Sequence, residues 1–367
     1  MKGLYIHIPF CIKKCNYCDF ASYPSLISKS NDYISAMLSE MKLYKGEKID
    51  TVYFGGGTPT VLQINQLQTL ISFVFSNFRV LDGAEITIEV NPCTINKEKA
   101  IELRKMGFNR VSLGAQSFLN DELKLLGRLH TSDDTISAYK HLSDAGFNNI
   151  SLDLMYALPN QTNKSLSTSI EQMLKLKPNH ISCYGLKIED GTPFSLMERE
   201  GKIKEKSDDE YADMYEIISK NLLEAGYKQY ELSNFSLPGY ESKHNIKYWT
   251  LGEYIGIGLG ASSYYKGKRY TRTYDFDKYL ESFENAEEYE LSLSDKMSEY
   301  MFLSLRLTKR GALKKEFASY FGKEITDVFP NEIKKHVKTG MLLDLGDRYI
   351  LSKKAYYISN SVLCDFV

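Results

Sequence analysis

The sequence predicts an α/β fold: an open, six-unit (β/α) partial TIM barrel, followed by a small C-terminal α+β domain of winged-helix-like type. Short β-branched runs alternate with longer segments of helical period up to about residue 230, and such alternation is typical of a parallel sheet. Glycine-rich and polar residues gather where the expected strands end, which is the face that carries the active site in β/α barrels. The alternation of strand and helix patterns ends at about residue 235, which predicts a further domain.

Six strands and five helices are expected in the barrel. The strand candidates are residues 4–8, 51–54, 86–90, 110–113, 150–154 and 181–184. The helical patterns between them cover residues 32–44, 64–75, 97–106, 133–145 and 166–176. Gly107 and Gly146 follow two of these helices, as expected because glycine commonly follows a helix C-terminus. Six units are two short of a closed eight-fold barrel, so we expect the sheet to stay open.

The chain is expected to divide into a barrel core (1–235), a connecting region (236–290) and a C-terminal domain (291–367). Residues 234–249 are interpreted as an irregular loop, and 275–290 as a segment that begins as a helix. The glycines within 256–261 indicate tight backbone packing. In the C-terminal domain, helical stretches at 296–307, 313–321 and 332–338 precede two short strands at 342–344 and 349–351. Helices followed by a small hairpin predict the winged-helix-like unit.

Charge and hydropathy exclude two classes of function. The chain has 46 Lys and Arg against 47 Asp and Glu, for a formal net charge of −1, so no basic excess indicates nucleic-acid binding. Residues 313–321 also carry few basic side chains, which disfavours DNA binding by the C-terminal unit. No run of about 18 apolar residues predicts a membrane-spanning helix. Because nothing at the N-terminus resembles a secretory signal, we expect a cytoplasmic protein whose thiols stay reduced.

Three cysteines in one short run are the most informative motif. Cys11, Cys15 and Cys18 have Cys-x3-Cys-x2-Cys spacing and directly follow the first expected strand. Three thiolates on one loop can hold three corners of an iron–sulfur cubane and leave one iron open. An open iron can bind a small chelating ligand such as S-adenosylmethionine, through its amino and carboxylate groups. A zinc site completed by Asp19 or His7 is the alternative.

The other three cysteines, Cys93, Cys183 and Cys364, lie far from this run in sequence. We interpret Cys93 and Cys183 as small buried residues, which is the usual fate of a free cysteine. A disulfide is disfavoured by the expected reducing compartment.

Polar residues at the ends of later strands could complete a site for an adenosyl amino acid. The run Gly55-Gly56-Gly57-Thr58 follows the second strand and could approach a charged group closely with its backbone N–H groups. It lacks the spacing of a P-loop or a dinucleotide fingerprint, and a structural turn is the alternative. Glu89, Gln116, Arg128 and Asp153 could satisfy ammonium, carboxylate and ribose hydroxyl groups, although each alone could be an ordinary polar residue of the barrel.

His244 lies in the run His244-Asn245-Ile246-Lys247-Tyr248-Trp249, beside the single tryptophan of the chain. A lone histidine is usually structural or solvated. Imidazole is nevertheless a common haem ligand, and aromatic side chains pack on porphyrin faces, so a haem contact is the second interpretation.

These motifs resemble those of the radical S-adenosylmethionine (radical SAM) proteins related to oxygen-independent coproporphyrinogen III oxidase. The resemblance covers nearly the whole chain, and it rests on residues 5–11, 15–20, 55–60, 116–118, 153–162 and 244–249. Within this group the chain looks most like the haem chaperones. The oxidase has a further cysteine two positions after the third cluster cysteine, where this chain has Phe20, and an extended segment ahead of the cluster.

The resemblance implies cofactors and site residues. Cys11, Cys15 and Cys18 hold a 4Fe-4S cluster, and the residues around bound S-adenosylmethionine are Tyr5, Gly56, Gly57, Thr58, Glu89, Gln116, Arg128 and Asp153. His244 is expected to contact haem near the open side of the barrel, with Tyr248 and Trp249 beside it. The implied function is a haem chaperone that transfers haem to acceptor proteins. The alternative is a radical SAM enzyme that decarboxylates coproporphyrinogen III or opens haem. The acceptor, the oligomeric state and any peripheral membrane association stay open.

Overall fold

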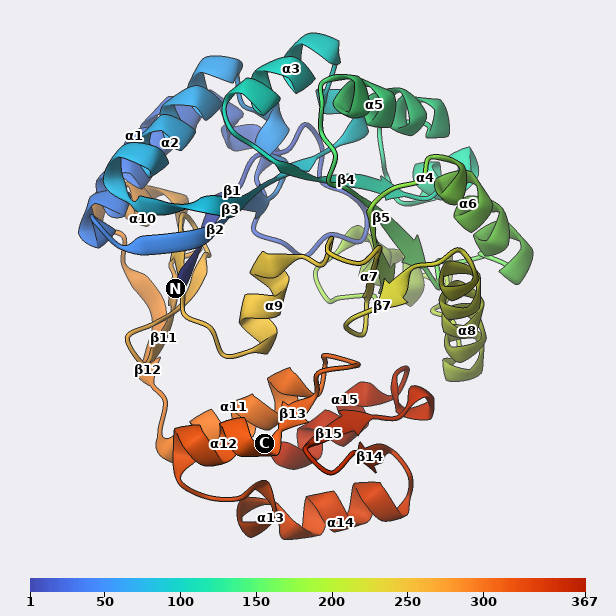
Figure 1. Ribbon diagram of the computed structural model, residues 1–367. Helices are drawn as coiled ribbons and strands as arrows, with labels where there is room; N and C mark the ends of the chain where they lie inside the picture. Colours follow the sequence, from blue (N-terminus) through green and yellow to red (C-terminus); the bar gives the residue numbers. More distant parts are fainter.

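The computed structural model describes residues 1–367 and is built around one twelve-stranded sheet (Figure 1). The strand order is β12-β11-β10-β9-β1-β2-β3-β4-β5-β6-β8-β7. Its parallel strands are β1 (Lys2–Ile8), β2 (Lys48–Gly56), β3 (Arg79–Val90), β4 (Arg110–Gln116), β5 (Ile150–Tyr156), β6 (His180–Gly185) and β9 (Tyr254–Ile257). All six predicted strands are present and consecutive, and the two edges of the sheet do not pair, so the expected open six-unit barrel is confirmed.

Antiparallel strands extend both edges of this parallel sheet. Beyond β6 lie β8 (Asn234–Ser236) and β7 (Lys228–Gln229), and beyond β9 lie β10 (Ser262–Tyr265), β11 (Lys268–Arg272) and β12 (Asn285–Glu290). The sequence did not predict β9 as a seventh parallel strand beside β1. The expected tight packing of the glycines within 256–261 is confirmed. A Cβ on Gly256 would lie 2.2 Å from the carbonyl oxygen of Ser262, and a Cβ on Gly258 would lie 2.6 Å from the Tyr33 hydroxyl oxygen.

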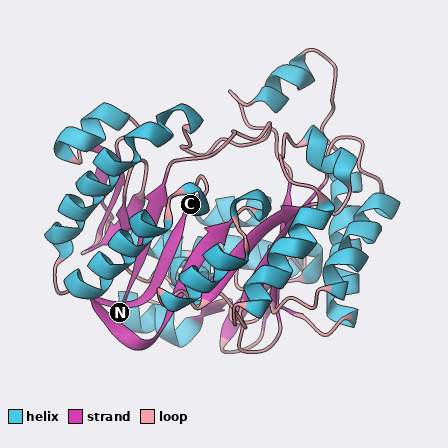
Figure 2. Ribbon diagram, turned by 90° about the horizontal axis from the view of Figure 1, so that it is seen from above, coloured by secondary structure: helices cyan, strands magenta, loops and turns pink.

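Helices cover the outer face of the sheet (Figures 1 and 2). They are α1 (Ser30–Met41), α2 (Ile64–Asn77), α3 (Lys97–Lys105), α5 (Ser132–Asp144), α6 (Asn163–Lys175) and α8 (Asp208–Glu224), with shorter helices α4 (Asn120–Leu125) and α7 (Pro193–Arg199) in the loops. The five predicted helices are confirmed, and α8 is additional to them.

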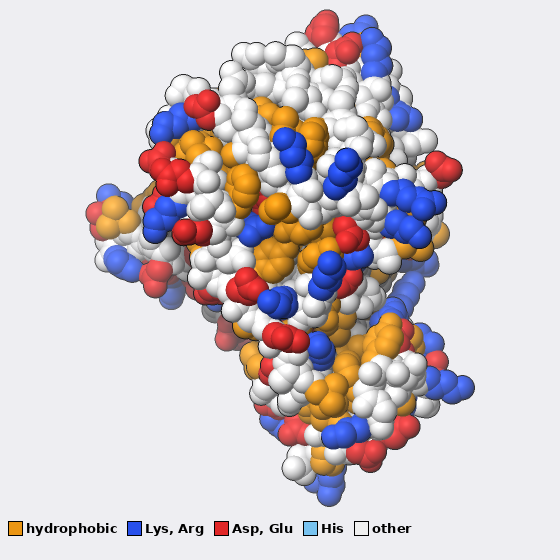
Figure 3. Space-filling model, turned by 90° about the vertical axis from the view of Figure 1, so that its left-hand side faces the viewer, with side chains coloured by type: hydrophobic (Ala, Val, Ile, Leu, Met, Phe, Trp, Pro, Cys, Tyr) orange, Lys and Arg blue, Asp and Glu red, His pale blue; other side chains and the backbone are white.

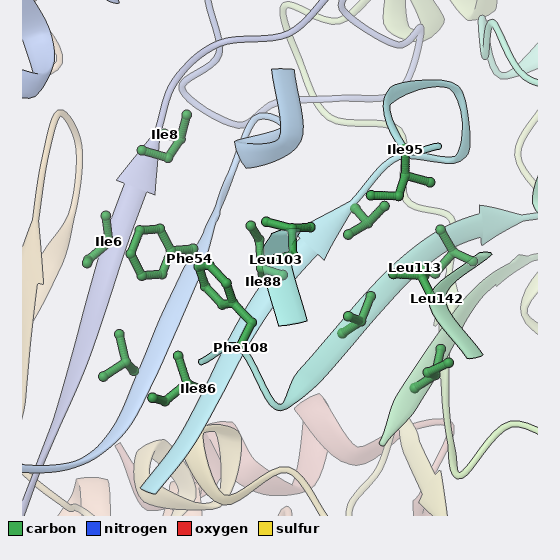
Figure 4. Close-up of a cluster of buried hydrophobic side chains, with 14 of the residues drawn as sticks. Ile6, Ile8, Phe54, Ile86, Ile88, Ile95, Leu103, Phe108, Leu113 and Leu142 are labelled. Carbon is green, nitrogen blue, oxygen red and sulfur yellow. The ribbon is translucent and has the colours of Figure 1, made fainter. Parts of the chain in front are cut away.

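Alternation along the strands separates the core from the barrel interior. Leu4, Ile6 and Ile8 of β1 point outward and are fully buried, because successive side chains of a strand point to opposite faces. They belong to a cluster of 55 buried residues between sheet and helices. Figure 4 shows Phe54 against Phe108 in this cluster, and their ring centroids are 5.1 Å apart. The residues between them, such as Tyr5 and His7, face the interior of the barrel.

The prediction of an irregular loop over residues 234–249 is wrong. This segment contains β8 and the helix α9 (Lys243–Trp249), which begins at Ser242, whose side chain accepts a hydrogen bond from the Asn245 N–H. Tyr248 and Trp249 are the last two residues of this short helix. The expected helical start of residues 275–290 is confirmed by α10 (Phe276–Ser282).

The C-terminal residues form a smaller lobe with its own core of 17 buried residues, one of which, Leu232, comes from the barrel side. Its helices are α11 (Leu293–Ser304), α12 (Lys314–Phe321), α13 (Ile325–Val328), α14 (Pro330–Lys338) and α15 (Ser359–Leu363). They pack on an antiparallel sheet of β13 (Ala312–Leu313), β15 (Arg348–Leu351) and β14 (Leu342–Asp344). The predicted helices and hairpin are confirmed.

Charges of both signs are mixed on the face seen in Figure 3, on the larger body and on the lobe below it. This face therefore offers no single-sign surface of the kind that attracts a polyanion. None of the helices combines the length and the apolar character that crossing a bilayer requires.

Candidate functional site

The three cysteines lie on a loop, residues 9–20, that leaves the C-terminal end of β1. We call it the cluster loop. Asn16 fixes its middle, because its backbone N–H donates to Leu126 O at 3.0 Å and its side-chain amide donates to Leu125 O at 2.8 Å. The carbonyl of Asn16 accepts from the N–H of Phe194 at 2.9 Å. The loop is therefore held from two other barrel loops before any cofactor is bound.

Each of two thiols has a polar neighbour from another strand end. Cys11 Sγ lies 3.6 Å from Thr58 Oγ1, and Cys15 Sγ accepts from Nη1 of Arg128 at 3.6 Å. Partial burial raises the pKa of Cys11 and of Cys18, so a bound metal is needed to hold them as thiolates at neutral pH.

Cys11, Cys15 and Cys18 are all free, half-buried thiols on the cluster loop. No group of three or more His, Cys, Asp or Glu side chains is arranged to hold a single metal ion. Three soft thiol ligands on one loop are a donor set that suits an iron–sulfur cluster.

The loop after β2 packs so closely against the cluster loop that glycine is required at its start. A Cβ on Gly57 would lie 2.6 Å from Phe10 O and 3.0 Å from Cys11 Sγ, and Gly56 has φ +108°. The N–H groups of this loop are already used: Gly57 donates to Ile8 O at 2.8 Å and Thr58 to Phe10 O at 2.8 Å. The expectation that these N–H groups cradle a charged ligand does not fit this geometry. Their role is to shape the cluster loop.

Glu89, at the end of β3, faces the barrel interior beside this glycine loop. Its carboxylate accepts from the Tyr53 hydroxyl at 2.8 Å and from the Gly56 N–H at 3.2 Å. Burial, with a smaller contribution from the nearby Asp153 carboxylate, raises the pKa of Glu89 to about 7. Glu89 is therefore a partly buried carboxylate that a cationic or hydroxyl-bearing ligand would stabilise in its charged form.

Asp153 of β5 lies deeper between the strands. It accepts from the Ser112 hydroxyl at 3.0 and 3.1 Å and from the Ser151 hydroxyl at 3.3 Å. Burial raises its pKa above the ordinary range. Its oxygens are thus already supplied with donors from the protein.

Gln116 and Arg128 meet at Gly114, at the end of β4. Arg128 Nη2 donates to Gly114 O at 3.0 Å, and a Cβ on Gly114 would lie 2.9 Å from Gln116 Nε2. Gln116 itself has φ +65°, which is a strained conformation for a residue with a side chain. The structure therefore brings Gln116, Arg128 and Cys15 together, as expected for one site.

Tyr5 lies on β1 opposite Tyr53 of β2. Its hydroxyl bonds Nδ1 of His7 at 3.0 Å, while Nε2 of His7 bonds Ala21 O at 2.9 Å. The carbonyl needs a donor, so Nε2 carries the proton and Nδ1 accepts from Tyr5. Burial lowers the pKa of His7, and this neutral ring ties the end of the cluster loop to β1.

His244 lies at the opposite, N-terminal end of the strands. Its Nδ1 bonds Thr51 Oγ1 at 2.8 Å, its Nε2 bonds the Tyr248 hydroxyl at 2.8 Å, and only 1% of the residue is exposed. Burial lowers the pKa of His244 to about 3. Thr51 pairs with Glu85, which comes four residues before Glu89 on β3. His244 and Thr51 therefore lie about 13 Å from Glu89 along the strand direction, toward the N-terminal end of the strands.

This geometry does not present His244 to a ligand at the open side, contrary to the expectation from the sequence. Both ring nitrogens are occupied. The imidazole instead stacks on Tyr53, with ring centroids 5.2 Å apart, and anchors Tyr248.

A cavity of about 530 Å³ opens between the cluster loop, β1, α9 and the β9–β11 strands. We call it the aromatic cavity. Its aromatic lining includes Tyr5, Phe20, Tyr248, Trp249, Tyr254 and Tyr274. Its volume lies within the range of about 300–1,000 Å³ that is usual for small-molecule sites. Tyr248 and Trp249 therefore reach the cavity, whereas His244 supports them from behind.

A second, narrow cleft joins Cys15, Thr58, Arg128 and Cys93. Cys93 is exposed there, so its interpretation as a buried residue is wrong, while Cys183 is buried as expected. The sequence reasoning also missed His130, whose Nδ1 accepts from Nε of Arg128 at 3.3 Å. The sequence did offer a signal for His130, because it lies only two positions after Arg128, which was already a candidate site residue.

Comparison with known proteins adds to this geometry. Residues 5–173 match the family described as the Radical SAM superfamily. The chain is similar to the Heme chaperone HemW of Lactococcus lactis, with 38% identity over 366 residues that cover 99% of this chain and 96% of the relative. The Heme chaperone HemW of Bacillus subtilis is 36% identical and covers 100% of this chain and 99% of the relative.

Among solved structures, coproporphyrinogen III oxidase (HemN) from Escherichia coli, a radical SAM enzyme, matches with a TM-score of 0.86. It is 22% identical, and the match covers 99% of this chain and 89% of that chain. At this level of identity, the structural match shows that the two chains share a fold.

Proposed function

Because this chain belongs to the radical SAM superfamily and, within it, to the family of the haem chaperone HemW, we propose that it binds haem in the aromatic cavity and transfers it to acceptor haem proteins in the cytoplasm. The observation that carries this proposal is the position of the cavity. It adjoins the cluster loop through Asp19 and Phe20, and it adjoins the C-terminal end of α9 through Tyr248 and Trp249.

The lining of the cavity suits a flat, apolar macrocycle. Aromatic rings pack well against a porphyrin face. Phe20 is 63% exposed, and an exposed phenylalanine beside a cavity of aromatic side chains indicates a surface that is covered when a ligand binds. Phe20 lies two residues after Cys18, so a ligand against it is also close to the cluster loop.

The cofactors of the family are a 4Fe-4S cluster and S-adenosylmethionine. We assign Cys11, Cys15 and Cys18 to the cluster, since they are three soft thiol ligands on one preformed loop. When bound, the cluster with S-adenosylmethionine supplies a redox-active group with one open iron. Arg128 places a positive charge beside Cys15, and this charge stabilises the thiolate form.

We assign Gln116, Arg128, Glu89 and Asp153 to the surroundings of S-adenosylmethionine, with Gly56, Gly57 and Thr58 shaping the loop and Tyr5 between the two sites. Glu89 is the best-placed acceptor for an ammonium or a ribose hydroxyl. Burial raises its pKa to about 7, so a donor from a ligand would stabilise its charged form. Arg128 already donates to Gly114 O and to Cys15, so it orients that side of the site.

The test starts from anaerobically prepared, cluster-loaded protein. Haem is titrated into it, and the Soret band is followed; the complex is then mixed with the apo-form of a b-type cytochrome, and the recovery of the cytochrome spectrum is measured. We expect stoichiometric haem binding, transfer to the apo-cytochrome and no catalytic formation of 5′-deoxyadenosine from S-adenosylmethionine. Turnover of haem or of coproporphyrinogen III with many equivalents of 5′-deoxyadenosine would contradict the proposal and favour the enzymatic alternative.

A further inference from the structure

Arg306, just after the end of α11, lies against the ring of Trp249 at the end of α9. The guanidinium carbon is 4.6 Å from the ring centroid. One residue belongs to the C-terminal lobe and the other to the motif that lines the aromatic cavity. This contact therefore joins the lobe to the wall of the cavity.

Both residues carry a buried N–H donor that has no acceptor. Arg306 Nε and Trp249 Nε1 are each shielded from solvent, and neither has a hydrogen-bond partner. A buried donor without a partner loses the hydrogen bonds that it made to water, and buried charges are normally paired. Two adjacent unpaired donors from different parts of the fold indicate that a ligand supplies the acceptor.

Nearby arginines do not share this feature. Arg269, which lines the aromatic cavity, is paired with Glu299 at 2.6 Å, and Arg310 is paired with Glu316 at 2.7 Å. Glu231 is near enough to act on Arg306 electrostatically, but no hydrogen bond or ion pair joins the two side chains, and Glu231 Oε1 accepts from the Asn234 side-chain amide and from the Ser233 N–H. Arg306 is thus the cation beside the cavity that keeps its donors free.

The position of Arg306 allows it to reach a ligand in the cavity. Leu303 lines the cavity and comes three residues before Arg306, so the two side chains lie on the same side of the helix end. The Arg306 side chain is only partly buried. A carboxylate at the edge of Trp249 could therefore bind the guanidinium and the indole N–H together.

We propose that Arg306 and the indole N–H of Trp249 bind a propionate carboxylate of haem, so that the C-terminal lobe takes part in holding the porphyrin. This inference rests on the proposed function and deepens it. A guanidinium and a carboxylate form a charge-assisted pair that is about twice as strong as a neutral hydrogen bond. The macrocycle then packs on the aromatic lining, and its carboxylate edge faces α11.

The test compares haem with haem dimethyl ester, in which both carboxylates are masked. Each is titrated into the wild-type protein and into the variants Arg306→Gln, Arg306→Lys and Trp249→Phe. We expect Arg306→Gln to weaken haem binding about tenfold or more, as loss of a charged contact does, and to leave binding of the ester unchanged. Arg306→Lys should recover part of the loss. Trp249→Phe keeps an aromatic face for the guanidinium and should lose about threefold.

Arg310→Gln is the matched control, because it removes the same charge four residues later from a side chain that is paired with Glu316. It should bind haem as the wild type does. Thermal unfolding of each variant shows whether weaker haem binding comes from a lost contact with haem or from a loss of folding. If Arg306→Gln does not fold, Trp249→Phe and Arg306→Lys still test the inference.

Equal haem affinity of the wild type and the Arg306 and Trp249 variants would overturn this inference and leave the proposed function intact. So would a wild-type protein that binds the ester as tightly as haem. A wild-type protein that binds neither compound would overturn both.

Discussion

Nη1 of Arg128 lies 3.6 Å from Sγ of Cys15, although 113 residues separate them in the chain. The contact joins the loop after β4 to the loop after β1. The same guanidinium donates to Gly114 O at 3.0 Å and to His130 Nδ1 at 3.3 Å, so one side chain ties the cluster loop to the neighbouring strand end. The cation compensates the negative charge that thiolates bring to this end of the barrel.

Replacement of Cys11, Cys15 and Cys18 by Ala should abolish the cluster. The loop supplies three thiols, and anaerobic reconstitution of the wild type should give about four iron and four sulfide per chain, the content of the cubane type. Iron and sulfide analysis is the measurement. Cys364→Ser is the control and should keep full iron content, because this residue lies in the C-terminal lobe. Full iron content in the triple variant would disprove the assignment.

Gly57→Ala should lower cluster content. The new Cβ would meet Phe10 O at 2.6 Å and Cys11 Sγ at 3.0 Å, and such overpacking costs about 1–3 kcal/mol. The expected result is a lower thermal midpoint together with iron content well below that of the wild type. Gly83→Ala is the matched control, since Gly83 has φ +73° and no atom within 4 Å of the added Cβ. It should lose about 1 kcal/mol of stability from backbone strain but keep its cluster.

The barrel was predictable because its sequence pattern is local. Strand β1 and the helices α2 and α5 carry period-2 or period-3.6 patterns of buried residues that are visible without any long-range contact. Helix α8 was missed, although Ser207 and Glu210 form a capping box at its start, which was a readable signal.

The additions to the sheet were not predictable in this way. Strand β9 has four residues, one of which is Gly256, and it forms because it pairs in parallel with β1, some 250 positions earlier. The same limit applies to the site. The sequence indicated Gln116, Arg128 and the cluster cysteines from their place at strand ends, and the structure brings them together. It could not show that the α9 helix turns His244 away from the cavity, because that depends on contacts with Thr51 and Glu85.

Stability should depend on pH through Glu89. Burial raises its pKa to about 7, so between its ordinary value and 7 the folded protein holds a proton that the unfolded chain has released. The contribution of Glu89 to stability is full below about pH 4.5 and is lost as pH rises through 7. The free energy of unfolding of Glu89→Gln, relative to the wild type, should therefore rise by about 1–3 kcal/mol across this window.

Chemical denaturation of the cofactor-free protein at several pH values measures this difference. Glu231, whose pKa burial also raises to about 7, is present in both proteins and cancels. Replacement of the exposed Glu224 by Gln is the matched surface control. A difference between Glu89→Gln and the wild type that stays constant across this pH range would contradict the prediction.

His244→Ala should destabilise the protein rather than alter its haem spectrum. The substitution leaves the hydroxyls of Thr51 and Tyr248 without their partners and opens a buried space, at a cost of about 2–4 kcal/mol. We expect a lower thermal midpoint, and in the folded fraction a Soret band at the wild-type position. Lys243→Ala, at the exposed neighbouring position, should change neither. A shifted Soret band with an unchanged thermal midpoint would instead identify His244 as the haem ligand.

Coproporphyrinogen III should not be turned over, even with S-adenosylmethionine and a reductant present. Phe20 stands where the related oxidase has a further cysteine, and its ring forms part of the wall of the aromatic cavity. A phenyl ring can pack against a porphyrin but supplies no thiol for ligation or hydrogen transfer. Fluorescence of protoporphyrin after oxidation of the product measures turnover. Phe20→Ala should weaken haem binding, because it removes apolar contact area, whereas Ile12→Ala, an exposed position of the same loop outside the cavity, should not. Protoporphyrinogen formed in many equivalents per chain would show that the cavity holds a substrate and not a cargo.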